Sequence, residues 1–481
     1  MIGKHTFAGR APGSFGGQQS GRSGREEGPY MTAGNPGAAS AQERLTQEQV
    51  VEWSKRYTLF DWTAQSRITP FPVARAEGVY FYGTGGQRYL DFNSQLMCVN
   101  AGQGDRRIVD AITAQAAELA YVNSAAMTTE VRARLGHKLA QLFPGDIEKS
   151  FFTLGGAEAN ENAVRIARAV TGRQKILARY RSYHGATAGA ISLTGDPRRW
   201  ANEPGVPGVV HVLDFYHGTA RPADSAGGAL AALEETIQLE GPATIAAFII
   251  EPITGTNGIL IPPDGYLQGV REICDRYGIL LIADEVMSGF GRTGAWFAVD
   301  HYGVVPDIIT CAKGLTSSYL PLGAVGIRPQ VAAYFDDHRF GGGLTYNSHP
   351  VALAAALATI GVYEEDGLVE HAAKMGELLA RQHAELAARH PSVGGHRSIG
   401  LFGCLDIVRN RATGEPMAPF NGTSPEMAEL LAFMISNGVY TLVHWNQVMT
   451  NPPLIITEEQ LAEGFAVLDR ALGITDRAVT G

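Results

Sequence analysis

The chain has 481 residues, of which 45% are hydrophobic and 18% are charged, and this predicts two or more globular domains with sizeable cores. Its 39 basic and 48 acidic side chains give a formal net charge of -9 without a dense Lys/Arg tract, so nucleic acid and acidic membrane surfaces are not expected as main partners. The four cysteines are scattered without a Cys-x-x-Cys pair, which indicates thiols in a reducing compartment and no zinc site.

Residues 1–40 are rich in glycine and poor in large apolar side chains, so we expect this segment to be disordered. It lacks the apolar centre of a secretory signal, and no apolar run of the chain is long enough to cross a bilayer. These observations predict a cytoplasmic protein with no membrane partner. We also hypothesise that Met31 is the true start and that the preceding residues are an extension.

Residues 41–100 are expected to form the first part of a small α+β domain. After a helical opening, two runs rich in aromatic and β-branched residues flank a glycine turn between Gly78 and Phe92, which predicts a hairpin. After Tyr346 helices dominate, and a capping box from Thr457 to Gln460 starts a helix with an apolar stripe. We therefore predict a second part of the small domain over residues 347–481.

Residues 101–346 contain short apolar runs that alternate with helix-like segments, such as Ala157 to Val170. Such runs are typical of strands covered by helices on both faces. The pattern predicts an α/β fold with a mostly parallel, doubly wound sheet in a large domain. The expected strands are Lys149 to Thr153, Ile176 to Tyr180, Val209 to Leu213, Ile245 to Glu251, Ile279 to Asp284, Ile308 to Ala312 and Leu322 to Ile327.

Two of the expected strands end in charged residues. Asp284 and Glu285 close the run that starts at Ile279, and Lys313 follows the run that starts at Ile308. Because ligands bind at the carboxyl ends of parallel strands, an acid and an amine at this edge are candidate ligand contacts. A buried structural ion pair between Asp284 and Lys313 is the alternative interpretation.

Two further strand ends add an anion site and an aromatic ring. Gly155 and Gly156 lead from a strand into a helix, so free backbone N–H groups and a positive helix end would face an anion. Tyr183 follows the next strand and is either a packing residue or a stacking partner. Pyridoxal phosphate calls for this combination: a phosphate grip, a stacking ring, an acid for the pyridinium nitrogen and a lysine for the Schiff base.

A rival interpretation comes from the G-x-G-x-x-G pattern at Gly289, Gly291 and Gly294, which is typical of dinucleotide-binding proteins. That fingerprint begins at a strand end and opens directly into a helix. Here two acids and further residues separate it from the strand, and the residues after Gly294 are not a typical helix start. The chain has no His-Glu-x-x-His motif and its histidines are scattered, so we expect no metal.

The motifs occur in an order that resembles one known family. They are Gly155 to Asn160, Tyr183 to Gly185, Glu251-Pro252, Asp284 to Val286 with Gly289 to Gly294, Ala312 to Gly314 and Leu344 to Tyr346. This series is similar to that of the class III, or ω-type, aminotransferases, which are pyridoxal phosphate enzymes of fold type I. The resemblance covers about residue 45 to the end.

The resemblance implies that Lys313 forms the Schiff base and shuttles the proton, and that Asp284 pairs with the pyridine nitrogen of pyridoxal 5'-phosphate. The other implied cofactor contacts are Gly156, Ala157, Tyr183, His184, Glu251, Val286 and Thr345. Tyr183 and Val286 would flank the ring, and the glycine–alanine backbone would bind phosphate. Thr345 would reach the phosphate of the neighbouring subunit, so the resemblance implies a homodimer with shared active sites.

The substrate site departs from the family pattern. Members of the pyruvate-dependent branch often carry a carboxylate-binding arginine about ten residues before a Pro-Pro-Leu, but here that position falls near Leu442. Leucine offers no guanidinium fork, so either His444 or an arginine from elsewhere substitutes, or the preferred substrates are less acidic. Met97 stands where the branch often has tryptophan, and would either leave room for bulky amines or pack in the core. Trp62 completes the predicted substrate contacts.

We therefore predict a pyridoxal phosphate-dependent aminotransferase that moves an amino group from an amine or ω-amino acid to a keto acid, with pyruvate as the expected acceptor. Three alternatives stay open at this point. They are another reaction of the same cofactor, such as decarboxylation or amino-group migration, a nicotinamide-dependent oxidoreductase built on the Gly289 motif, and a non-catalytic binding protein that keeps the fold.

Overall fold

The computed structural model describes residues 45–217, 221–222 and 226–480, so the expected disorder of residues 1–40 and the hypothesis about Met31 fall outside the described residues. The chain splits into two units between residues 69 and 70, and each is described by itself. In the first unit, α1 (Gln47–Tyr57) begins with a capping box. The Thr46 side chain accepts a hydrogen bond from the Gln49 N–H group, and the Gln49 side chain accepts one from the Thr46 N–H group.

The second unit contains a seven-stranded sheet that agrees with each of the seven expected strands to within one residue. Its order is β4 (Lys149–Thr153), β12 (Gly323–Ile327), β11 (Ile308–Cys311), β10 (Leu280–Asp284), β9 (Ile245–Ile250), β5 (Lys175–Arg179) and β6 (Val209–Val212). β12 is antiparallel to both neighbours, and the other neighbouring pairs are parallel. The chain reaches β12 from β11 without a crossover helix of the kind that parallel neighbours need. The prediction of a mostly parallel sheet is confirmed.

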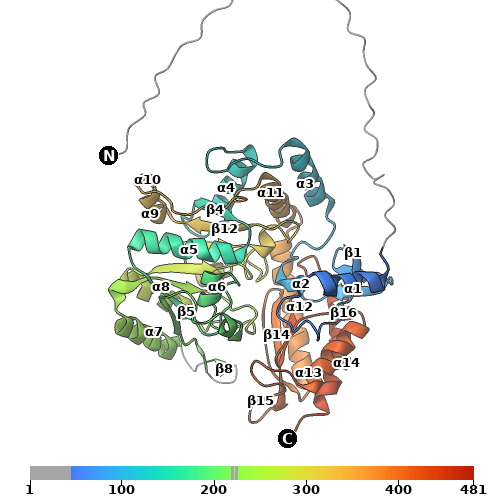
Figure 1. Cartoon of the computed structure of the whole chain (residues 1–481). Coiled ribbons are helices and arrows are strands. Elements are labelled where there is room, and N and C mark those ends of the chain that lie inside the picture. The colour runs from blue at the N-terminus through green and yellow to red at the C-terminus, as the bar shows by residue number, and fades with distance from the viewer. Residues whose placement is uncertain (1–44, 218–220, 223–225, 481) are drawn as a thin grey trace, which may run out of the picture. The chain divides into compact units, whose positions relative to one another are not determined.

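Helices cover both faces of this sheet, as the doubly wound prediction requires. Alternate side chains of a strand point to opposite faces, so Ile249 packs with α5 (Gly156–Thr171), whereas Phe248 packs with α7 (Ala226–Glu240) and α8 (Tyr266–Tyr277). Figure 1 shows α5 on one side of the strands and α7 and α8 on the other. The strands are therefore apolar on both faces, and polar residues are concentrated at their ends.

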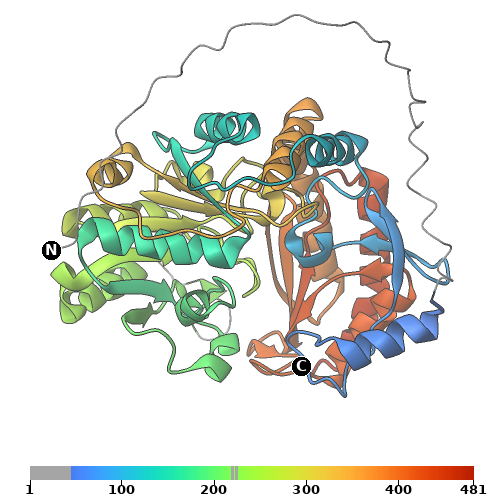
Figure 2. The same cartoon turned by 45° about the horizontal axis from the view of Figure 1, so that its top comes forward.

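Segments from early and late in the second unit share a four-stranded sheet. Its order is β1 (Val73–Glu77), β2 (Tyr80–Gly83), β3 (Arg88–Asp91) and β16 (Val439–Tyr440). The expected hairpin is β2 paired with β3 in antiparallel fashion. Phe92 meets Phe465 of α14 (Glu458–Asp476) edge to face at 5.3 Å between ring centroids, and Figure 2 shows the blue strands beside the red helices. The predicted capping box at Thr457 is confirmed.

A further antiparallel sheet follows the large sheet in the chain. It consists of β13 (Val393–Ile399), β14 (Phe402–Asn410), β18 (Gln447–Thr450) and β17 (Val443–His444), with β15 (Glu415–Pro416) on β14. The short strands β7 (Tyr216–His217) and β8 (Arg221–Pro222) pair with each other. The predicted domain limits at residues 100 and 346 stay a prediction.

The remaining helices pack around these sheets. They are α2 (Ser94–Met97), α3 (Arg106–Glu118), α4 (Glu130–Leu142), α6 (Ala188–Leu193), α9 (Pro329–Ala332), α10 (Tyr334–Asp337), α11 (Pro350–Glu365), α12 (Leu368–Arg389) and α13 (Pro425–Ser436), with 3-10 helices at Pro197–Asn202, Pro242–Thr244, Ala298–Tyr302 and Lys313–Leu315. Among the described residues, we find no helix that combines the length and the apolar character needed to cross a membrane.

Candidate active site

A cavity of about 530 Å³ lies at the carboxyl ends of the parallel strands. Its walls come from the start of α5, from the loops after β5 and β9, and from the ends of β10 and β11. The lining includes eight of the nine residues predicted to contact a cofactor: Gly156, Ala157, Tyr183, His184, Glu251, Asp284, Val286 and Lys313. Neighbouring parallel strands end at one edge of a sheet, and this geometry brings these distant positions together.

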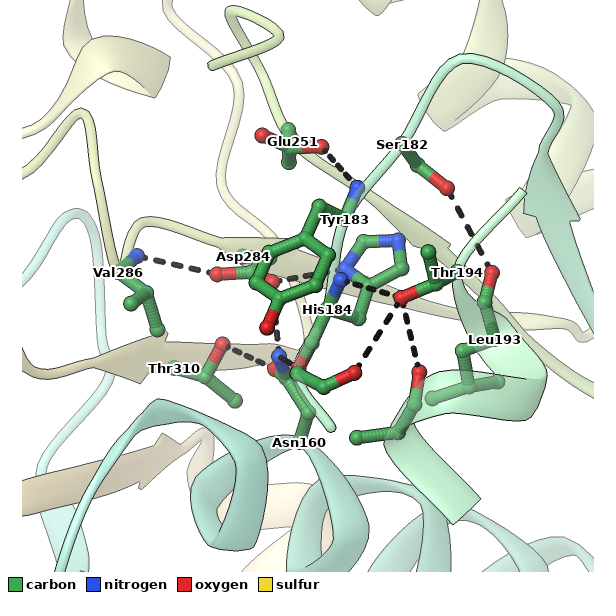
Figure 3. A network of polar contacts seen from close by, with 12 residues as sticks. Asn160, Ser182, Tyr183, His184, Leu193, Thr194, Glu251, Asp284, Val286 and Thr310 are labelled. Carbon is green, nitrogen blue, oxygen red and sulfur yellow. Dashed lines mark hydrogen bonds and ion pairs between the residues drawn. The ribbon is translucent and has the colours of Figure 1, made fainter. Parts of the chain in front are cut away.

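Asp284 is the centre of a buried polar network, which Figure 3 shows from close by. Its side chain is 3% exposed. One oxygen, Oδ1, accepts from the Val286 N–H group at 3.0 Å. The other, Oδ2, accepts from Asn160 Nδ2 at 2.8 Å and lies 2.7 Å from His184 Nδ1. Three different segments therefore fix the orientation of this carboxylate.

Asn160 is a residue of this network to which sequence reasoning assigned no role. Its Nδ2 also donates to the His184 carbonyl at 2.8 Å, and its Oδ1 accepts from Thr310 Oγ1 at 2.7 Å. Asn160 lies four positions after Gly156 in α5, so helical spacing places both on one face of the helix. This spacing of four residues could have identified Asn160 from the sequence. When the first turn of a helix faces a ligand, a residue one turn later lies on the same face of the helix.

Lys313 follows β11 and enters the same cavity. Its φ angle of 44° lies in the left-handed region, which non-glycine residues adopt at some energetic expense. Burial lowers the pKa of the Lys313 ammonium group, while the nearby Cys98, Asp284 and Glu251 act to raise it. A larger fraction of this amine is therefore neutral near physiological pH than for an exposed lysine.

The start of α5 forms a close-packed wall with an open helix terminus. The N-cap is Gly155, so no side chain caps the first turn. A Cβ atom on Gly156 would lie 2.7 Å from Val286 Cγ1, and a Cβ atom on Gly185 would lie 2.5 Å from the Ala157 Cβ atom. Glycine at these two positions allows three chain segments to meet around backbone N–H groups that can bind an anion.

Glu251 ties two loops of the cavity together. Its Oε1 accepts from the Tyr183 N–H group at 3.0 Å, and its Oε2 accepts from the Gly255 N–H group at 2.8 Å. Burial raises the pKa of the Glu251 carboxyl. The backbone that carries the Tyr183 ring is therefore anchored to the residue that follows β9.

The predicted substrate contacts lie in different surroundings. Met97 is 2% exposed and packs in a core cluster with residues such as Ile253 and Phe402, and it is absent from the cavity lining. His444 lies behind the wall, with Nδ1 2.6 Å from the carbonyl of the lining residue Thr256. Trp62 belongs to the first unit of the chain, and its substrate contact stays a prediction.

Thr345, the ninth predicted cofactor contact, is absent from the lining of the cavity in its own chain. Its carbonyl accepts from the Tyr121 hydroxyl at 2.8 Å. The expectation that Thr345 acts in a neighbouring subunit stays a prediction.

The glycine pattern at Gly289, Gly291 and Gly294 does not open into a dinucleotide-binding helix. The residues between Glu285 and Gly294 form turns, and the next helix is the short 3-10 helix Ala298–Tyr302. Gly291 packs against Leu454, because a Cβ atom there would lie 2.8 Å from Leu454 Cδ1. The motif is a turn beside the cavity.

Both the fold and this cavity are those of a pyridoxal phosphate enzyme, and comparison with known proteins identifies the family. The class III aminotransferase family model ("Aminotransferase class-III") matches residues 63–472. The putrescine-pyruvate aminotransferase of Pseudomonas aeruginosa is 35% identical over 423 residues, which are 85% of this chain and 91% of the relative. The taurine-pyruvate aminotransferase of Bilophila wadsworthia is 35% identical over 448 residues, which are 88% of this chain and 96% of the relative.

A solved structure agrees with these relatives. The taurine:2-oxoglutarate aminotransferase of Bifidobacterium kashiwanohense, in complex with pyridoxal phosphate and glutamate, has a TM-score of 0.88 and 40% identity. The alignment covers 91% of this chain and 100% of that chain. The chain therefore belongs to the class III aminotransferases. It is a pyridoxal phosphate-dependent transaminase, as the sequence motifs predicted.

Proposed function

We propose that this transaminase moves an amino group from an amine or ω-amino acid to pyruvate. Two relatives are named for pyruvate, with putrescine or taurine as the other substrate, and the solved relative is named for taurine and 2-oxoglutarate. One observation carries the proposal: Lys313, Asp284 and the uncapped first turn of α5 line a single cavity.

The described residues fit pyridoxal phosphate. Backbone N–H groups at the start of α5 would bind its phosphate, and the carboxylate of Asp284, held by three contacts, would face its ring nitrogen. Lys313 would hold it covalently, since burial lowers the pKa of this amine. When bound, the cofactor supplies an aldehyde carbon that amines attack and an electron-withdrawing ring.

We assign the remaining roles from the positions of the side chains. When it is not bound to the cofactor, the Lys313 amine would accept a proton at Nζ from one carbon and donate it to another, as a general base and acid. Asp284 would hold a proton on the ring nitrogen, because an ionised carboxylate stabilises an adjacent cation. Tyr183 and Val286 would flank the ring, while Asn160 and His184 keep the carboxylate of Asp284 in place.

The colour and the product of the reaction test the proposal. Purified protein should be yellow, and borohydride should fix the cofactor on the peptide that contains Lys313, whereas Lys313→Ala protein should show no fixed cofactor. Mixing the enzyme with taurine or putrescine and pyruvate should yield alanine. Carbon dioxide release without alanine would indicate decarboxylation, and a protein that cannot be coloured by pyridoxal phosphate would refute the assignment of the site.

The homodimer belongs to the same proposal. If Thr345 of each subunit completes the site of its partner, the variants Lys313→Ala and Thr345→Val should be impaired alone and should regain activity when mixed. The mixed dimer then contains one site with an intact lysine and an intact threonine. Absence of recovery after subunit exchange would mean that Thr345 does not act across an interface.

We also propose a cytoplasmic location. The four cysteines are free thiols in the structure, with Cys98 partly exposed and the other three buried, as expected in a reducing compartment. Fractionation of cells that produce the protein from its native gene, followed by immunodetection, tests this proposal. Detection mainly outside the cytoplasmic fraction would contradict it.

A further inference from the structure

The chain places a leucine where the family pattern has a carboxylate-binding arginine, so the site needs another group for acidic substrates. His444 is one candidate, but its contacts argue against it. Its Nδ1 lies 2.6 Å from the Thr256 carbonyl, which can only accept, so Nδ1 carries a hydrogen. Burial lowers the pKa of His444, so the ring is neutral and its Nε2 is an acceptor, which repels an anion.

Two buried arginines near the cavity are committed to the protein itself. Arg292 is 0% exposed and donates to the carbonyls of Leu401 and Pro452. Arg179 is 1% exposed and donates to the Glu251 carbonyl and to Thr254 Oγ1. Both guanidinium groups hold chain segments together. Neither residue is itself part of the cavity lining, and Arg198 is not a lining residue either.

Arg198 differs, because it contacts two side chains of the cavity wall. Its guanidinium carbon lies 3.7 Å from the centroid of the Tyr183 ring, and its Nη2 donates to Thr256 Oγ1 at 2.7 Å. Tyr183 and Thr256 both line the cavity. The Arg198 side chain keeps 23% of its surface exposed, while its Nη2 also pairs with the buried carboxylate of Asp196. Burial is the main cause that lowers the pKa of Lys313, and the charge of Arg198 acts in the same direction.

Arg198 is held in place by its neighbours. Asp196 caps the 3-10 helix that carries it, and both Asp196 oxygens accept from Arg198 Nε, at 3.1 Å and 3.0 Å. Asn257 Nδ2 in turn donates to Asp196 Oδ2 at 3.1 Å. A guanidinium group has five N–H donors in a fork, and a carboxylate on one edge orients the group for an anion on another.

We propose that Arg198 binds the acid group, carboxylate or sulfonate, of the substrates and so replaces the arginine that is missing at Leu442. This inference rests on the proposed transamination and names the substrate class of the same site. Amines without an acid group gain nothing from Arg198. The residue therefore sets the preference for taurine-like donors and keto acid acceptors over plain amines and aldehydes.

The test compares acidic and neutral substrates in separate half-reactions of the holoenzyme, followed by cofactor absorbance. Arg198→Gln should raise KM about 10- to 100-fold for taurine, β-alanine and pyruvate, because charge-assisted hydrogen bonds are lost. Hexylamine and butanal should react as before, within about twofold. Arg198→Lys, which keeps the charge without the fork, should recover part of the loss.

The neighbouring arginine supplies a matched control. Arg199 donates to the Gly195 carbonyl at 3.2 Å and pairs with Glu203, so Arg199→Gln removes the same charge without touching Tyr183 or Thr256. It should leave the acidic substrates unaffected. Calorimetric titration with ethanesulfonate and with propionate, which carry no amine, should detect binding to the unchanged holoenzyme and to Arg199→Gln, and no binding to Arg198→Gln.

The outcomes separate this inference from the proposed function. An equal loss for acidic and neutral substrates in Arg198→Gln, or unchanged ethanesulfonate binding, would overturn the role of Arg198. Failure of the unchanged protein to form alanine from any donor would instead refute the proposed transamination. Unfolding midpoints of the variants show whether a loss of activity with all substrates comes from misfolding. In that case Arg198→Lys, assayed with the same acidic and neutral substrates, decides whether Arg198 binds the acid group.

Discussion

The substitution Asn160→Asp would place a second carboxyl group against Asp284. The Asn160 Nδ2 atom donates to Asp284 Oδ2 and to the His184 carbonyl, each at 2.8 Å, so an ionised carboxyl here would face two acceptors. Two carboxylates at 2.8 Å repel each other by about 6 kcal/mol at an effective dielectric constant of about 20, or about four orders of magnitude in proton affinity. The new carboxyl group should therefore stay protonated at neutral pH in the folded, cofactor-free protein.

Stability of this variant should fall as pH rises. Its new carboxyl group has a folded-state pKa raised above the unfolded value of about 3.9, so above about pH 4 the folded state binds more protons than the unfolded state. The loss is about 1.4 kcal/mol per pH unit. From about pH 5 to about pH 8 the deficit relative to the unchanged chain should grow by about 4 kcal/mol, or about 4 °C in unfolding midpoint at this length.

Thermal unfolding of cofactor-free protein at both pH values checks this expectation, with Asn162→Asp as the control. Asn162 is also buried in α5, but its Nδ2 donates to the Glu158 carbonyl at 2.8 Å and its Oδ1 accepts from the Arg165 guanidinium at 3.1 Å. A carboxylate there would meet a cation, so we expect no growing deficit. A stability deficit of Asn160→Asp that does not change with pH, or the same change with pH in both variants, would refute the reasoning.

Three further changes probe the site. Lys313→Ala should lower turnover by at least about 10³-fold, while pyridoxal phosphate still binds without a covalent link. Absorbance and mass spectrometry after borohydride treatment can show this. Full activity of the variant would contradict the role of Lys313. Gly156→Ala should weaken cofactor binding about tenfold or more by overpacking, since the new Cβ atom would lie 2.7 Å from Val286 Cγ1. If this contact is the cause, adding Val286→Ala should recover the affinity in a cofactor titration. Glu285→Gln should become more stable relative to the unchanged chain from about pH 5 to about pH 8, because burial raises the pKa of Glu285 to about 7, and a buried acid with a raised folded-state pKa destabilises the fold above its unfolded pKa. A pH-independent difference in unfolding midpoint would mean that Glu285 ionises as an exposed acid does.

Patterns along the chain were sufficient for much of the fold and for the core of the candidate site. Each strand of the seven-stranded sheet was expected within one residue, because an apolar run that ends in a charge or a glycine turn is a local signal. Asp284, Lys313, Gly156 and Tyr183 were found for the same reason. Asp284 ends such a run and the other three follow one within four residues, and the carboxyl ends of parallel strands meet at one edge of the sheet.

The tertiary structure decided the contacts between loops and between layers. No local sequence pattern indicates such contacts. Asn160 reaches Asp284 only because α5 lies across β10 and β11, and Arg198 reaches Tyr183 and Thr256 only because the segment after α6 folds back over the loop that follows β9. Met97 lies in the core cluster because the chain there turns through three positive φ angles, at Ser94, Gln95 and Met97. The sequence by itself therefore determined the class of the protein and its cofactor, and it predicted the main candidate site residues. The neighbours that orient those residues, and the arginine to which we assign acidic substrates, depend on packing between segments far apart in the chain.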